Sequence, residues 1–332
     1  MKRLAMLSAL TLIALPLPAH AAGTDTAFGV ISSTQGPSEP DTWQNFVRLY
    51  DIQRERYQSP IGIRLFSGGR LPLPGEPSMV GRLLDWAIRK HPEEIITISH
   101  RVRDDARLRQ FLDVVKDRGI RVSVIYFHEA QAAWFKHRDR AAEPSAYQAA
   151  YRKYRDIIDR HPAHAQVTLE KNLMWYWQRF NTSEFPTSDW RRYVGTNDPA
   201  DLLSWDTYTF PGVPPRIESY STPDEFFRYA RDAWREFRMQ WGVGEIGSTV
   251  QDGTDADRAW DPDGKKFTSW VRTIAAAAAN PQTIDGSYAG MPPAKFVKWW
   301  CARDAKDIEL GLEQVPSAVD LYRPLIQAYP LK

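Results

Sequence analysis

Short apolar runs alternate with longer stretches of helical spacing along most of the chain. The runs are rich in Val, Ile, Phe and Trp, which is typical of β-strands. Eight such runs occur, at residues 27–32, 61–66, 94–99, 121–126, 166–170, 201–206, 241–245 and 295–301. Because strands that alternate with helices form parallel sheets, the pattern predicts a series of βα units.

Amphipathic segments fill the intervals between the runs. Residues 79–90 carry apolar side chains at Val80, Leu83, Leu84 and Ala87, which is the spacing of one helix face. Further helices are expected at residues 41–57, 103–118, 144–160, 223–240 and 267–279. Eight strands with intervening helices predict a closed (β/α)8 TIM barrel. An open, doubly wound sheet is the alternative, but it would require a Gly-rich phosphate loop after an early strand, and none is present.

The N-terminal segment differs from the rest of the chain. A basic start at Lys2 and Arg3 precedes the apolar stretch 4–17, and Ala19-His20-Ala21 is a small-x-small cleavage motif. These features predict a signal peptide over residues 1–21 and a protein secreted to the extracellular or periplasmic space. The alternative is an uncleaved anchor. No other long apolar run follows, so no membrane span is expected, and the absence of a Gly/Ser-rich linker predicts one domain over residues 22–332.

The charge and the cysteine content of the chain limit the kinds of partner and of covalent link that are expected. The chain has 43 Lys and Arg and 41 Asp and Glu, and two basic residues leave with the signal peptide. The remaining chain is formally neutral and contains no basic tract, so a nucleic-acid partner is not expected. The single cysteine, Cys301, excludes an internal disulfide and is interpreted as a small buried apolar residue. We expect a monomer.

Polar or aromatic side chains end most of the predicted strands. In a (β/α)8 barrel these ends form the active-site face. The candidates are Arg64, His100, His128 with Glu129, Asn172, Asp206 with Tyr208, and Glu245, together with Trp299 and Trp300 in the last strand. Glu129 and Glu245 end the fourth and seventh strands, which lie opposite each other in a barrel. Two carboxyl groups about 5–5.5 Å apart are the machinery of retaining glycosidases. The sequence therefore predicts a glycoside hydrolase.

Other chemistries were weighed for the same residues. A zincin would need a second histidine four residues after His128, where the chain has Ala132. A serine hydrolase would need a Gly-x-Ser-x-Gly elbow, which is absent. A metal site built from His100, His128 and Asp206 stays open as an alternative. Each glutamate taken singly is also compatible with an ordinary surface carboxylate.

Three motifs resemble a known family. They are His128-Glu129 followed after four residues by Trp134-Phe135, then Asp206-Thr207-Tyr208, and then Gly244-Glu245-Ile246-Gly247. Together with a tryptophan in the last strand, they resemble family 26 glycoside hydrolases, the mannanase family of clan A. The resemblance implies a retaining, endo-acting enzyme that needs no cofactor. No metal is expected at the site. Tyr126-Phe127 stands where family members often have Arg-Pro, so the substrate is left open among β-mannan, a related β-glycan and xylan.

The resemblance and the chemistry assign roles. Glu129 is expected to be the acid/base and Glu245 the nucleophile, to which Tyr208 donates a hydrogen bond. His128, Asn172 and Asp206 are expected to bind substrate. Arg64 either contacts substrate or pairs with Asp206 or Glu245. Trp134 either stacks on sugar or packs in the core, and the choice between Trp299 and Trp300 is open. A non-catalytic barrel that binds carbohydrate is the alternative to an enzyme.

Overall fold

The computed structural model describes residues 25–33, 43–180, 189–211, 219–252, 255–300 and 310–331. The predicted signal peptide, Cys301 and part of the proline-rich segment after Phe210 lie outside these residues. No described helix is both long enough and apolar enough to cross a bilayer.

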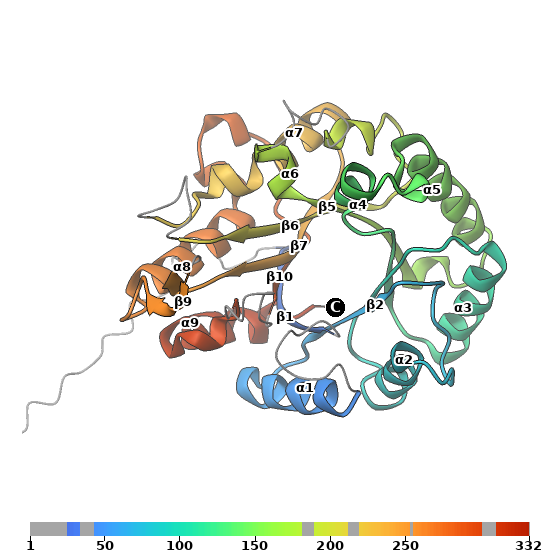
Figure 1. Cartoon of the computed structure of the whole chain (residues 1–332), viewed down its shortest axis with the longest axis horizontal. Coiled ribbons are helices and arrows are strands. Elements are labelled where there is room, and N and C mark those ends of the chain that lie inside the picture. Colours follow the sequence, from blue (N-terminus) through green and yellow to red (C-terminus); the bar gives the residue numbers. More distant parts are fainter. Residues whose placement is uncertain are drawn as a thin grey trace, which may run out of the picture.

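Eight parallel strands close into a barrel, as predicted, in the order β1-β10-β7-β6-β5-β4-β3-β2 (Figure 1). The barrel strands are β1 (Ala27–Ser33), β2 (Gly62–Ser67), β3 (Ile96–His100), β4 (Val122–Tyr126), β5 (Val167–Met174), β6 (Leu202–Thr209), β7 (Trp241–Ser248) and β10 (Phe296–Trp300). A two-stranded ribbon, β8 (Gln251–Asp252) with β9 (Asp255–Ala259), follows β7. The (β/α)8 architecture is therefore confirmed.

Helices surround the barrel. They are α1 (Trp43–Tyr57), α2 (Met79–Lys90), α3 (Asp105–Arg118), α4 (Ala130–His137), α5 (Pro144–Asp159), α6 (Trp175–Phe180), α7 (Pro223–Phe237), α8 (Lys265–Ala279) and α9 (Pro316–Ala328). The six helices expected from periodicity are all present. The short α4 and α6 were not predicted, because one or two helical turns carry too little apolar repeat to be recognised. Helix α9 was not predicted either; it contains Pro324 in its interior, and a proline interrupts the sequence pattern of a helix.

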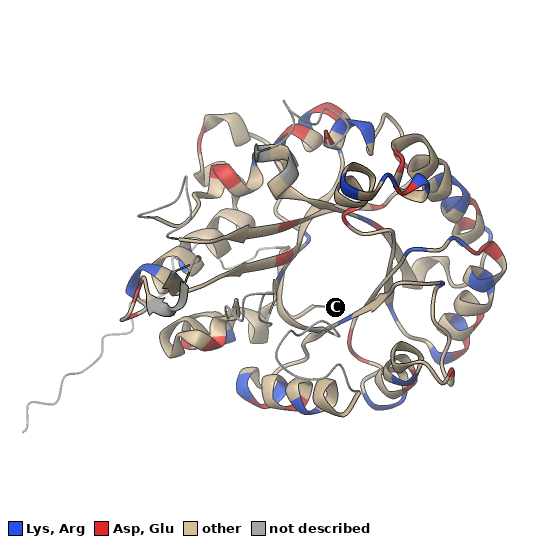
Figure 2. Cartoon of the chain, in the orientation of Figure 1, with Lys and Arg blue, Asp and Glu red and all other residues tan. Residues whose placement is uncertain are grey.

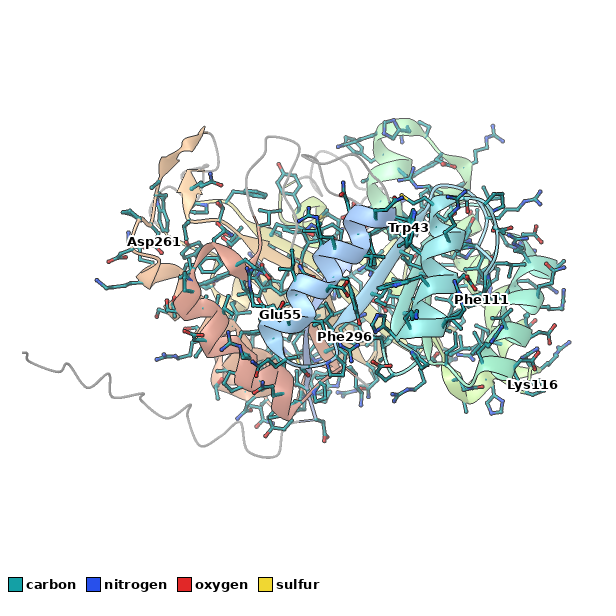
Figure 3. The ribbon with its side chains drawn as sticks, turned by 90° about the horizontal axis from the view of Figure 1, so that it is seen from below. Trp43, Glu55, Phe111, Lys116, Asp261 and Phe296 are labelled. Atoms are coloured by element: carbon teal, nitrogen blue, oxygen red, sulfur yellow. The ribbon has the colours of Figure 1, made fainter. Side chains whose placement is uncertain are left out.

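The two ends of the barrel are distinct. In Figure 3 helix α1 descends from Trp43 to Glu55, and Phe296, which begins β10, also lies low. Because helices run antiparallel to the strands in this fold, the carboxyl ends of the strands point upward in that view. The lower end is closed by the last residues of the chain. Leu331 is buried there, and its side chain fills the space that a Cβ at Gly29 or Gly62 would need.

Charge is distributed over the outer helices in both signs, as expected for a solvated surface (Figure 2). Acidic positions also appear on β6 and β7 inside the ring. Buried charges are costly unless they are paired or hydrogen-bonded, so their presence inside a barrel indicates a site rather than a packing core.

One irregularity decides which side chains enter the barrel. Between Trp205 and Asp206 of β6, the partner strand β7 advances by two residues, from Val243 to Glu245. The pairing of β10 with the other side of β7 shows the same extra residue in β7, because two residues of β10 are matched by three of β7. A β-bulge breaks the alternation of faces, so Gly244 and Glu245 both face the interior. Gly244 must be a glycine, because a Cβ there would lie 2.5 Å from the amide nitrogen of Asn172.

Candidate active site

Glu129 is held in an unusual backbone conformation at the end of β4. It has φ 52° and ψ 39°, and Phe127 two residues before it has φ 54°. Left-handed conformations cost a residue with a side chain about 1 kcal/mol or more. The neighbouring strands hold the turn: the Phe127 N–H donates to the His100 carbonyl at 2.7 Å, and the Glu129 N–H donates to the Asn172 carbonyl at 3.0 Å. The turn brings the Glu129 carboxyl to the barrel mouth.

Glu245 lies inside the mouth and both of its oxygens have cationic or hydroxyl neighbours. The Tyr208 hydroxyl donates to its Oε2 at 2.7 Å. The guanidinium of Arg64, from β2, lies 3.3 Å from its Oε1. Only 6% of Glu245 is exposed to solvent. The carboxylate is therefore fixed in orientation by Tyr208 and Arg64, which suits attack on a bound substrate.

Asn172 links the parts of the site. Its Oδ1 accepts from Arg64 at 3.3 Å, and its Nδ2 donates to Asp206 Oδ1 at 2.8 Å and to the Ser204 hydroxyl at 3.0 Å. Its carbonyl holds Glu129, as described above. Asn172, Asp206 and Arg64 are fully buried. These three candidates thus lie beneath the mouth, where they support Glu245 rather than facing solvent.

A charged layer lies deeper in the barrel. Glu170 accepts from the hydroxyls of Ser123 and Ser204, and the Lys298 ammonium lies 3.7 Å away from it. Burial acts to raise the pKa of Glu170, but Lys298 and Arg64 together hold it below its usual value. Glu170 is thus an ionised, fully paired group and has no proton to give. Sequence reasoning named it only as an end of the fifth run and did not find this layer.

The electrostatics separate the two glutamates at the mouth. Loss of solvent and the negative charge of Glu245 raise the pKa of Glu129 to about 8. Burial also raises the pKa of Glu245, but Arg64 and the Tyr208 hydroxyl oppose that shift. Burial and Glu245 raise the pKa of Asp206 as well. In a cluster of three carboxyl groups the protons are shared, and Glu245 has the strongest contacts that favour its ionised form.

Aromatic rings form one wall of the mouth. The ring centroid of Phe66 lies 4.9 Å from that of His128 and 5.8 Å from that of Trp300. Burial and the nearby charge of Arg64 lower the pKa of His128 to about 3, so this imidazole is neutral. Sequence reasoning missed Phe66. The sequence feature that could have identified Phe66 is its position two residues after Arg64, which places both side chains on the same face of β2.

The structure separates the two tryptophans of β10. Trp300 packs with Ile31 and Leu310 beside Phe66 and faces the mouth. Trp299 points the other way, into the helix layer, where its ring lies 5.5 Å from Trp270 of α8. Trp134 lies on α4, half-buried, with the Arg138 guanidinium 5.7 Å from its ring centre. Only Trp300 therefore lines the interior of the barrel mouth.

His100 does not join the site. Its ring stacks on Tyr154 of α5 at 5.6 Å, and its Nδ1 lies 3.2 Å from the Val102 carbonyl. Successive residues of a strand face opposite sides, so Ser99 rather than His100 points inward. The structure does not bring His100, His128 and Asp206 together as metal ligands.

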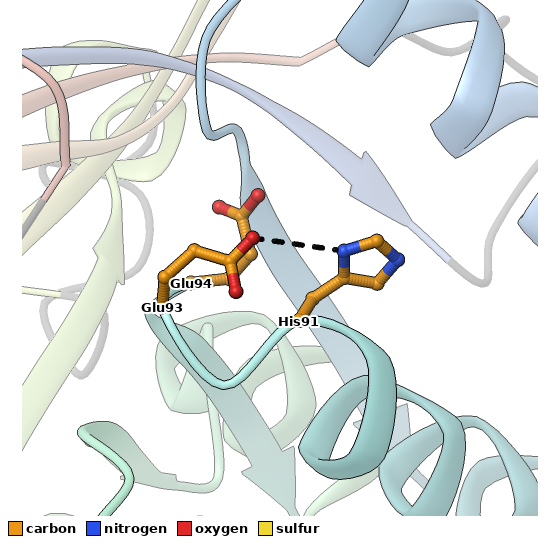
Figure 4. A group of neighbouring side chains, drawn as sticks. All are labelled: His91, Glu93 and Glu94. Carbon is orange, nitrogen blue, oxygen red and sulfur yellow. Dashed lines mark ion pairs between the residues drawn. The ribbon is translucent and has the colours of Figure 1, made fainter.

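Another group has the spacing of metal ligands. In the described part of the chain it is His91, Glu93 and Glu94, at the end of α2 (Figure 4). Arg54 lies within the group, 2.8 Å from Glu93 Oε1 and 3.0 Å from Glu94 Oε1, and 2.9 Å from His91 Nδ1. The guanidinium already supplies the positive charge that these carboxylates need, so we interpret the group as a structural ion-pair cluster.

A cavity of about 560 Å³ lies at the opposite end of the barrel. It is lined by strand starts, such as Thr168 and Leu202, and by Leu331 near the end of the chain. Lys298 forms its inner boundary and belongs to the charged layer that lies below Asn172. This cavity is therefore separate from the mouth that holds the two glutamates.

Comparisons with known proteins bear on the fold. No protein-family model matches the chain, and no curated protein is significantly similar to it in sequence. Solved structures are similar. Virulence factor SghA in complex with its substrate analogue salicin matches with a TM-score of 0.56 and 12% identity, over 94% of this chain and 98% of that one. A Thermotoga maritima β-glucosidase gives 0.53 and 11%, over 93% and 99%.

A ruminal GH26 endo-β-1,4-mannanase is also similar, with a TM-score of 0.50 and 10% identity over 90% of this chain and 63% of that one. The resemblance to family 26 stated from the motifs therefore extends to the fold. At this level of identity the likeness concerns the backbone arrangement, and the chemistry must be argued from the side chains at the mouth.

Proposed function

We propose that the protein is a secreted, retaining glycoside hydrolase that cleaves a β-linked polysaccharide, with Glu129 as acid/base and Glu245 as nucleophile. One observation carries the proposal. The Glu129 carboxyl follows β4, and burial together with the charge of Glu245 on β7 raises its pKa to about 8. Arg64 and Tyr208 hold the Glu245 carboxylate. One carboxyl is suited to donate a proton and the other to attack as an anion.

The reaction follows from these roles. Glu129 donates its proton to the glycosidic oxygen, and the Glu245 carboxylate attacks the anomeric carbon as the C–O bond to the leaving group breaks. A covalent glycosyl-enzyme results. Glu129, now ionised, removes a proton from water, and the water oxygen displaces Glu245 from the anomeric carbon. Each glutamate returns to its starting state, so no cofactor enters the balance.

The neighbours in fold support this class of reaction. They include β-glucosidases and the GH26 mannanase. The aromatic wall of Phe66, His128 and Trp300 supports sugar binding, because the apolar faces of pyranose rings pack on aromatic rings. We propose that His128 and Trp300 contact sugar directly and that Asn172 and Asp206 act by holding Arg64 and Glu129. Trp134 packs against the hydrophobic core and is partly buried, and it is retained as a candidate for stacking on sugar.

Activity on dyed polysaccharides tests the proposal directly. We expect soluble, β-configured fragments from mannan, xylan or mixed-linkage glucan, and chain-length analysis of early products will distinguish endo from exo action. Binding without release of reducing ends would instead support the non-catalytic carbohydrate-binding barrel.

The mature protein should begin after Ala21, and N-terminal sequencing of the exported form tests the proposed signal peptide. Size-exclusion chromatography tests the proposed monomer.

The pH profile should depend on Tyr208. The activity on a short substrate should fall at alkaline pH, near pH 8, as Glu129 loses its proton. Tyr208→Phe removes the hydrogen bond that lowers the pKa of Glu245, so that pKa rises further. In the pH profile of kcat/KM, the acid limb should move to higher pH by about one to two units. The alkaline limb, which reports Glu129, should stay in place. Tyr329→Phe at the opposite end of the barrel is the matched control; equal shifts in both variants would exclude the assigned contact.

The stereochemistry of the first product follows from the nucleophile. Two displacements at the same carbon restore its configuration, so the product should first appear as the β anomer. Proton NMR during the first minutes of hydrolysis, before mutarotation, measures this. An initial α anomer would show that water attacks directly and that Glu245 acts as a base.

A further inference from the structure

A groove of about 550 Å³ lies outside the mouth, between the start of α7 and the start of α8. Its lining includes Tyr220, Trp260, Lys266, Ser269, Trp270 and Thr273. The proposed mechanism uses none of these residues. Asp261, which adjoins Trp260 in sequence, is labelled in Figure 3 and lies at the margin of the molecule, near the β8–β9 ribbon.

The floor of this groove is aromatic and fixed. Tyr220 stacks on Trp270 with ring centroids 5.1 Å apart, and the ring of Trp260 meets Tyr220 edge to face at 5.0 Å. Hydrogen bonds anchor these rings, because the Tyr220 hydroxyl donates to the Thr249 carbonyl at 3.0 Å and the Trp270 indole donates to the Ser221 carbonyl at 2.8 Å. A ring held on several sides loses little conformational entropy when a ligand binds to it.

The rim of the groove is polar. Ser269 and Thr273 are exposed on α8, and the exposed Lys266 places its ammonium 4.5 Å from the ring centre of Trp260. Among the side chains that the structure describes, no carboxylate lies within ion-pair distance of this ammonium. Hydroxyl and ammonium groups around a partly exposed indole match a pyranose ring, which has an apolar face and a rim of hydroxyl groups.

The groove lies on the same side of the barrel as the proposed catalytic pair. Thr249, which accepts from Tyr220, comes directly after β7 and four residues after Glu245. Four residues of extended strand span about 13 Å. Ser221 also donates to Thr209, the last residue of β6. The groove is therefore anchored to the carboxyl ends of β6 and β7, the two strands that carry Asp206 and Glu245.

We propose that the groove is a second, non-catalytic binding site for a segment of the polysaccharide, in which a sugar ring stacks on Trp260 and contacts Lys266. The inference rests on the proposed function, because it takes the polysaccharide as the ligand. A second site on one polymer raises the local concentration of the chain at the mouth. It should matter for long substrates and not for short ones.

The test compares two tryptophan variants. Trp260→Ala should weaken retardation in native gels that contain soluble mannan, xylan or mixed-linkage glucan by roughly fivefold to tenfold. Its matched control is Trp234→Ala, because Trp234 on α7 is also half-buried under a cation, with Arg238 at 4.8 Å. Both variants are made in a Glu245→Gln background for binding, so that the polymer is not consumed. In the active background Trp260→Ala should raise KM for the polymer and leave kcat/KM for a short aryl glycoside unchanged.

Equal retardation of the Trp260 and Trp234 variants would overturn the second site, even if the enzyme is active. The parent protein could bind the polysaccharide without hydrolysing it, and Trp260→Ala could lose that binding. This result would support the second site and overturn the proposed function. Ser269→Arg provides a variant that removes no packing, because the position is exposed on α8 and arginine is a good helix former. Its longer side chain should fill the groove and weaken retardation as Trp260→Ala does; unchanged retardation would exclude the groove as the binding site.

Discussion

Glu129→Ala should reduce hydrolysis of natural polysaccharide by about a hundred- to ten-thousandfold, because the leaving oxygen then departs without a proton. Glycosides with good leaving groups need no such proton, so formation of the glycosyl-enzyme from them should be affected far less. The mutation also leaves a space beside the anomeric carbon, where azide can attack in place of activated water. Added azide should restore turnover of the activated substrate and yield the β-glycosyl azide.

The matched control is Glu55→Ala, which removes an exposed carboxylate of α1 on the outside of the barrel (Figure 3). Its rates should equal those of the parent protein on both substrates. Initial rates by reducing-end assay and by released aryl alcohol measure the two reactions. Equal losses of Glu129→Ala on both substrates, with no response to azide, would contradict the role of acid/base.

The pattern of apolar runs was sufficient to predict the barrel, because eight strands buried on both faces leave a strong signal. The strand ends were less accurate. β5 and β7 continue to Met174 and Ser248, several residues beyond the expected ends. The extension of β5 contains Asn172, and the extension of β7 directly follows Glu245. These polar residues reduce apolar periodicity at the place where function is located. The boundaries were therefore missed for a physical reason: the site interrupts the pattern that identifies a strand.

Three features of the site depend on geometry that periodicity does not encode. The extra residue of β7 turns Glu245 into the barrel, and the left-handed turn at Glu129 aims the other carboxyl. The direction of Trp300 follows from the register of β10 against β1, which pairs Trp300 with Ile31. Sequence spacing placed these residues near one another, but only the three-dimensional structure distinguishes Trp300 at the mouth from Trp299 among the helices.

Glu245 should be the residue that becomes covalently attached to sugar. A 2-fluoro glycoside with a good leaving group should inactivate the enzyme with time, because fluorine destabilises the oxocarbenium-like transition states and the second step slows more than the first. Peptide mass mapping should then place one sugar on the peptide that contains Glu245. Glu245→Ala should lower activity on the order of 10⁴-fold or more, since no other group takes over the covalent step.

The competing carboxyl is Asp206, which is paired with Glu245 in register and lies in the same cluster. Its Oδ1 accepts from Asn172, and the residue is fully buried beneath the mouth, so a sugar carbon should not reach it. Asp206→Asn keeps the shape of the side chain and should retain the ability to be labelled at Glu245, though at a lower rate because Arg64 is held less firmly. Label on Asp206 would mean that the site opens by a movement of β6 and that Glu245 supports the nucleophile. Label on Glu245 in both proteins assigns the covalent step to β7 and to the bulge that turns this residue inward.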